Sequence, residues 1–176
     1  MTNQQLFEYL KDQAYSCQDE QILSNIMLKL KELIETSDDF DIANAVCFMW
    51  FNFTESKSYG LSPEWVKAQL DRGIGDVAMA AALLQYHAPE EYTILWAKQQ
   101  IERGIEDVAW AACCLCLTNL NKNGITIDWT KQQIERGIGE VKLAANYLYT
   151  KGYVTKKWRD QQLAKLEQNN DKSTTF

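Results

Sequence analysis

The residues Trp96-Ala-Lys-Gln-Gln-Ile-Glu-Arg-Gly104 return almost unchanged as Trp129-Thr-Lys-Gln-Gln-Ile-Glu-Arg-Gly137. An earlier copy reads Trp65-Val-Lys-Ala-Gln-Leu-Asp-Arg-Gly73, and a weaker one begins Trp158-Arg-Asp-Gln-Gln-Leu. Successive tryptophans stand 31, 33 and 29 residues apart. Repetition at a period of this size is typical of stacked helical repeats. This stretch therefore decides the fold class.

Each copy carries the signals of two helices. A Ser or Thr stands three residues before every tryptophan and predicts a helix N-cap, and the glycine predicts the end of that helix. An acidic residue and a small apolar run follow, as in Asp107-Val-Ala-Trp-Ala-Ala112, and predict a second helix with an acid at its positive end. The second helices over 77–84 and 108–117 are apolar nearly all round, so we expect them to be buried between neighbours. Lys142 and Asn146 predict one solvent-exposed face on the last copy, as expected near the end of an array.

The eight-residue step from tryptophan to glycine and the ending Tyr149-Thr-Lys-Gly152 resemble tetratricopeptide-like repeats of the Sel type, over about residues 40–165. The resemblance implies a right-handed stack of antiparallel helix pairs. It also implies a scaffold that binds other proteins.

We predict an all-α fold, namely an α-solenoid of about four antiparallel helix pairs with N- and C-terminal capping helices. It forms a single helical-repeat domain over residues 1–168. The expected parts are an N-terminal capping helix over 2–15, repeats over about 18–53, 62–86, 91–118 and 126–150, a C-terminal capping helix over 155–168, and a flexible tail over 169–176.

Composition favours a soluble protein of the cytoplasm. Hydrophobic residues make up 46% of the 176 residues, and the net charge is −6. The charge disfavours binding to nucleic acid or to an anionic membrane, and it suits a basic protein partner. The five cysteines are an odd number and mostly lie in expected helices, which indicates a reduced, cytoplasmic protein. The oligomeric state is left open.

Chemistry-bearing residues are sparse, so we expect no catalytic site, no metal site and no cofactor. Cys113, Cys114 and Cys116 share one apolar helix, where free cysteine behaves as a small hydrophobe, and core packing is favoured over metal binding. His87 is the single histidine and lies in an expected loop. Without an adjacent cysteine or acid pair it is weak support for catalysis.

Two repeated positions are candidates for partner binding. Gln69, Gln100, Gln133 and Gln162 recur at one position, where they could line a groove that binds a peptide backbone. The favoured alternative is that each amide satisfies a turn inside the stack. The basic ladder of Arg72, Arg103, Arg136 and Lys165 could track phosphates. A solvated face, or pairing with helix C-terminal carbonyls, is favoured because an acid directly precedes the first three basic residues. Lysine and acid pairs such as Lys98 with Glu102 are assigned to the face opposite the core.

Trp50 lies in an unusually aromatic helix, and it is either packed against the N-terminal cap or an exposed anchor for a partner. Packing is favoured.

The leading functional prediction is a non-enzymatic protein–protein interaction module, a helical-repeat scaffold or adaptor. The alternative is a stand-alone acidic inhibitor or immunity-type protein that blocks a basic enzyme such as a nuclease by charge complementarity.

Overall fold

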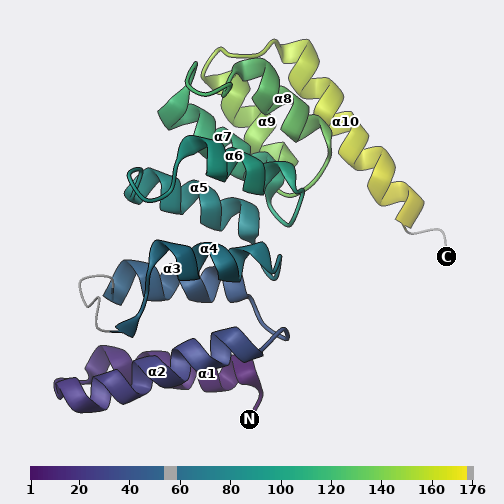
Figure 1. The fold of residues 1–176 in the computed structure, drawn as a ribbon. Coiled ribbons are helices and arrows are strands. Elements are labelled where there is room, and N and C mark those ends of the chain that lie inside the picture. The colour runs from purple at the N-terminus through teal and green to yellow at the C-terminus, as the bar shows by residue number, and fades with distance from the viewer. Residues whose placement is uncertain (54–58, 174–176) are drawn as a thin grey trace. The chain divides into compact units, whose positions relative to one another are not determined.

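A computed structural model describes residues 1–53 and 59–173, with side chains described as far as Gln168. Within these residues the chain is entirely helical, which confirms the all-α class. The helices are α1 (Asn3–Ser16), α2 (Glu20–Thr36), α3 (Ile42–Phe53), α4 (Pro63–Asp71), α5 (Val77–His87), α6 (Ile94–Glu102), α7 (Val108–Asn119), α8 (Ile127–Glu135), α9 (Val141–Thr150) and α10 (Lys156–Ser173) (Figure 1).

The helix starts follow the sequence signals. Thr2 opens α1 with a capping box, in which the Gln5 amide donates to Thr2 Oγ1 and Gln5 Oε1 accepts from the Thr2 amide. The hydroxyl three residues before each repeated tryptophan accepts from that tryptophan's amide, at 3.0 to 3.3 Å. Side-chain caps therefore fix where the tryptophan helices begin.

The backbone groups into two compact units, Met1–Asp76 and Val77–Phe176, each described here by itself. Unit 1 holds α1 to α4, and unit 2 holds α5 to α10. The division falls inside the predicted repeat 62–86. A single domain over 1–168 stays a prediction. The last helix continues to Ser173, five residues beyond the predicted end at 168, and residues 174–176 of the expected tail lie outside the described part.

Unit 2 is built around small buried residues. Helix α5 packs against α6 and α7, α7 against α8 and α9, and α9 against α10. Alanines and cysteines of α5 and α7 are buried together with Ile101 and Trp129 in one cluster. Side chains this small let helix backbones approach closely. A second cluster joins α7, α8 and α9 around Cys113 and Leu148.

Unit 1 relies on larger side chains. Met27, Leu30 and Ile34 of α2 are fully buried. Between α1 and α3, the Phe7 and Phe48 rings meet edge to face with centroids 6.0 Å apart. Ring packing of this kind contributes beyond the buried area itself.

One turn departs from the repeat in a way that costs stability. Glycine in two of three equivalent turns has positive φ, +83° at Gly75 and +81° at Gly139, whereas Glu106 holds this position with φ 58°. A left-handed conformation costs a residue with a Cβ roughly 1–2 kcal/mol. We expect Glu106→Gly to raise the free energy of unfolding by about 1 kcal/mol, measured by urea denaturation.

The matched control for this change is Glu140→Gly, because Glu140 has φ −74° and its side chain makes no capping hydrogen bond. It should not gain stability. A Glu106→Gly variant no more stable than the unaltered protein would refute the assignment of strain to this turn.

Candidate functional site

The four repeated glutamines are buried, each at most 9% exposed. In every copy the amide oxygen Oε1 accepts a hydrogen bond from the basic residue three positions later. The pairs are Gln69 with Arg72 at 2.9 Å, Gln100 with Arg103 at 2.6 Å, Gln133 with Arg136 at 2.8 Å and Gln162 with Lys165 at 3.3 Å. Each glutamine oxygen therefore accepts a hydrogen bond from within the protein. The binding of a partner's backbone by the glutamines stays a prediction.

The arginine held in this way caps a neighbouring helix. Arg136 Nη1 donates to the Glu102 carbonyl at 3.1 Å and reaches the Ile101 carbonyl at 3.5 Å, both at the C-terminal end of α6. Arg72 likewise donates to the Ile34 and Ser37 carbonyls at the end of α2. The last carbonyls of a helix lack the usual partner four residues on, and a cation suits the negative helix end. The Ile101 carbonyl also accepts from the Gly104 amide at 3.1 Å. Pairing with helix C-terminal carbonyls is therefore confirmed for both arginines.

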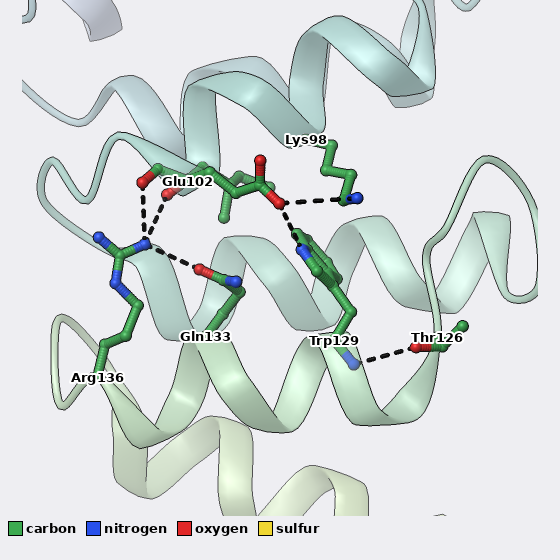
Figure 2. A network of polar contacts seen from close by, with 7 residues as sticks. Lys98, Glu102, Thr126, Trp129, Gln133 and Arg136 are labelled. Carbon is green, nitrogen blue, oxygen red and sulfur yellow. Dashed lines mark hydrogen bonds and ion pairs between the residues drawn. The ribbon is translucent and has the colours of Figure 1, made fainter.

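The lysine and the acid of a pair both contact the tryptophan of the next tryptophan-bearing helix. Figure 2 shows Lys98 and Glu102 of α6 facing Trp129 of α8. The Trp129 indole Nε1 donates to Glu102 Oε1 at 2.9 Å, and Lys98 Nζ lies 5.9 Å from the ring centroid. A cation over an indole face and a carboxylate on its N–H are both attractive contacts. The assignment of these pairs to a face away from the packing was wrong.

The same contacts recur at two other places. The Trp65 indole donates to Glu35 and lies under Lys31, and the Trp158 indole donates to Glu135 and lies under Lys131. We call this arrangement the tryptophan junction, with a receiving half (lysine and acid) and an inserting half (tryptophan, glutamine and basic residue).

The first and last junction helices carry one half each. Helix α2 has the receiving Lys31 and Glu35, but Leu33 and Thr36 stand where glutamine and arginine are expected. Helix α10 has the inserting residues, whereas Asp160 and Ala164 replace the receiving lysine and acid. The strictest sequence repetition therefore serves to join helices.

Trp50 is half-buried on α3, between the fully buried Met49 and the exposed Phe51. Its role as an anchor for a partner stays a prediction.

The cysteine cluster is part of the packing of α7. Cys113 and Cys116 are buried, Cys114 is half-buried, and no cysteine of the chain forms a disulfide. Burial raises the pKa of the Cys113 and Cys116 thiols, and it raises the pKa of Cys114 to about 11. The thiols are therefore protonated at neutral pH and weak as nucleophiles or metal ligands. Among the described residues no group of histidine, cysteine and acidic side chains could hold a metal ion.

A buried thiol in unit 1 predicts loss of stability at high pH. Burial, followed by the charges of Asp41 and Asp76, raises the pKa of Cys47 from 9.0 to about 12. Above pH 9 the unfolded thiol loses its proton while the folded thiol keeps it. Stability is therefore complete below pH 9 and falls as pH rises toward 12, by up to about 1.4 kcal/mol per pH unit.

The test compares the pH dependence of stability in Cys47→Ala and the unaltered protein, by urea denaturation at about pH 8 and about pH 10. The variant should lose less stability over this interval. Its cavity lowers stability at both pH values and cancels in the comparison. Equal losses would contradict the assignment.

A surface stripe of apolar side chains crosses the three second helices of unit 2. It comes from the third and seventh residues of each helix and from the tenth residue of α5 and α7, positions that lie on one helical face. We call these residues the apolar stripe: Met79, Leu83 and Tyr86 of α5, Trp110, Cys114 and Leu117 of α7, and Leu143 and Tyr147 of α9. Tyr86 is 61% exposed, Leu117 43% and Leu143 46%, and the other five are half-buried.

The helices that carry the apolar stripe pack against one another. The helices pack in the order α5, α7, α9, and the same positions are accessible on each. The Trp110 and Tyr147 rings meet edge to face with centroids 5.6 Å apart, which joins α7 to α9 directly. The expectation that α5 and α7 are buried between neighbours is therefore correct for most of their circumference and wrong for this face. The predicted solvent-exposed face of α9 is confirmed by the exposed Lys142.

Searches of the known proteins give no match for this chain. No family model, curated protein or solved structure is similar to it. The function must therefore be argued from the molecule itself.

Two further observations limit the choice. His87 is exposed at the end of α5, where its ring lies 4.9 Å from that of Tyr86 and meets it edge to face. In the described residues, no helix has both the length and the apolar character needed to cross a bilayer.

Proposed function

We propose that this chain is a non-enzymatic protein–protein interaction module that binds an apolar segment of another protein along the apolar stripe. The exposed stripe is the observation that carries the proposal. Contiguous apolar side chains on a surface mark binding sites, and tryptophan and tyrosine are frequent anchors at their centres. A partner helix with apolar residues on one face would fit a surface made of three parallel rows.

The proposed framework is an α-solenoid of about four antiparallel helix pairs with terminal capping helices, similar to tetratricopeptide-like repeats of the Sel type. The recurring tryptophan junction supports it, because the same contacts at successive helices would stack them in one direction. The half-junctions of α2 and α10 suit capping positions. Thiols without disulfides support the proposal of a reduced, cytoplasmic protein.

The nearly neutral charge of unit 2 favours binding through apolar contacts at the stripe. Unit 2 carries eleven acidic and twelve basic side chains in its sequence, so it is nearly neutral. Affinity would then come from burial of apolar area, at roughly 25 cal/mol per Å² before the costs of association. We expect the association to change little as salt is raised.

The alternative, an inhibitor of a basic enzyme, is favoured by one observation in unit 1. That unit carries thirteen acidic and six basic side chains, a net charge of −7. Such a field steers basic partners and weakens with ionic strength. Loss of binding at moderate salt would therefore favour the inhibitor, and persistence would favour the apolar stripe.

The test is capture of partners from a lysate of the source organism by the tagged protein and by the double variant Tyr86→Ser/Leu117→Ser. Both side chains are exposed, so the variant should fold normally. A stoichiometric partner bound by the unaltered protein should be lost. The matched control is Leu95→Ser on α6, which removes a 55% exposed leucine outside the stripe. Equal capture by all three proteins would refute the role of the stripe.

A further inference from the structure

Unit 1 contains a small cavity between α1 and α3, of about 90 Å³. Its apolar lining includes Phe7, Phe40 and Phe48. The Phe7 ring lies 5.4 Å from that of Phe40 and 6.0 Å from that of Phe48, centroid to centroid. Aromatic faces that line a cavity attract cations as well as apolar groups, because the ring face carries partial negative charge.

The polar lining of this cavity is mainly acidic or oxygen-bearing, with Glu8, Asp41 and Asn44. Oδ1 of Asp41 accepts from the amides of Asn44 at 2.9 Å and Asp76 at 3.3 Å. The Asp41 carboxylate therefore lies at the edge of the cavity with its Oδ1 held by two backbone amides.

A lysine of the chain itself already lies at this cavity. Lys11 lines the cavity, its Nζ lies 5.5 Å from the Phe48 ring centroid, and it forms an ion pair with Glu8. An ammonium therefore lies against an aromatic face and a carboxylate at the site. The net charge of −7 on unit 1 attracts a second, external cation to the same surroundings.

We propose that this cavity receives the guanidinium group of an arginine side chain from a basic protein partner. A guanidinium is planar and weakly hydrated, stacks on aromatic rings and donates to carboxylates in pairs. The cavity has room for one such head group. The site uses residues of unit 1 alone and does not depend on the apolar stripe of unit 2.

The guanidinium enters by displacing the Lys11 ammonium from the Phe48 ring. Both cations bind the same aromatic face and the same carboxylate, that of Glu8. Lys11 is therefore a competitor within the chain. Its removal frees the Phe48 ring and Oε2 of Glu8, while Oε1 still accepts from Gln4 Nε2 at 3.1 Å. Removal of a lysine elsewhere in unit 1 changes only the general charge.

The experiment uses the full chain and nuclear magnetic resonance. N-acetyl-arginine amide is titrated while the ring signals of Phe7 and Phe48 are followed, with N-acetyl-citrulline amide as the neutral compound of the same shape. The arginine compound should give saturable shifts at these rings, and the citrulline compound should not. Glu8→Gln should weaken the arginine binding.

Two lysine variants provide the decisive comparison. Lys11→Met should tighten binding of the arginine compound about two- to fivefold, the range expected for release of one cation–π contact. Lys29→Met changes the net charge equally at an exposed position of α2 and should alter the affinity much less. Absence of saturable shifts, equal binding of citrulline, or equal gains in the two variants would overturn the proposal. A failure of the apolar-stripe variants would leave these results unaffected.

Discussion

Replacing Trp129 with alanine is expected to lower the free energy of unfolding by about 3–5 kcal/mol, the range for truncating a buried tryptophan. Trp129 is 7% exposed and lies in the main apolar cluster of unit 2. Its indole N–H donates to Glu102, and Lys98 lies over its ring. The substitution therefore removes the packing, the hydrogen bond and the cation contact together. Urea denaturation followed by far-ultraviolet circular dichroism measures the loss.

Trp158 provides a matched comparison, because its junction contacts are nearly the same and its burial is not. It donates to Glu135 at 2.7 Å and lies under Lys131 at 6.0 Å, but it is half-buried on α10. Trp158→Ala should therefore cost clearly less than Trp129→Ala. Equal losses would mean that the polar contacts, rather than burial, dominate the junction. A loss below about 1 kcal/mol for Trp129→Ala would contradict its place in the core.

The second large effect is expected for Gly139→Ala, in the turn before α9. Gly139 has φ +81°, and a Cβ built there would lie 2.3 Å from Asp107 Oδ1 and 2.5 Å from the Asp107 Cα. The Asp107 carboxylate accepts from the Trp110 amide, which caps α7, and from the Glu140 amide. A methyl group at this turn would displace both contacts. We expect a loss of about 2–4 kcal/mol, from strain, backbone displacement and a damaged cap.

Gly137→Ala is the control, two residues away in the same turn. Gly137 has φ +76°, and nothing lies within 4 Å of a Cβ built there. This variant should lose only the cost of the left-handed conformation, roughly 1–2 kcal/mol. The difference between the two variants isolates the close approach to Asp107. Equal losses would show that the turn has room for a side chain at both positions.

Local signals in the sequence were sufficient for the starts of the capped helices. The hydroxyl caps before each tryptophan and the capping box at Thr2 were confirmed because they depend on neighbouring residues alone. The pairing of Arg72 and Arg136 with helix C-terminal carbonyls was also predicted, without the helix that supplies them. Which helix supplies those carbonyls depends on how the helices pack, and the sequence does not state that packing.

The errors came from reading each helix in isolation. Lys98 and Glu102 look like an ordinary exposed pair within α6, since their partner Trp129 lies 27 residues beyond Glu102. The apolar stripe was missed for a similar reason, because an all-apolar helix gives no sign of which face is left uncovered. Comparing the third and seventh residues of α5, α7 and α9 would have shown the shared apolar character of that face.

The most direct test of the account is a methyl-labelled resonance experiment on the protein with its captured partner. Binding along the apolar stripe predicts that the methyl signals of Met79, Leu83, Leu117 and Leu143 shift or broaden on addition of the partner. The signal of Leu95, exposed on α6 outside the stripe, should stay in place. Shifts at Leu95 with unchanged signals from the four stripe residues would contradict the proposed binding surface.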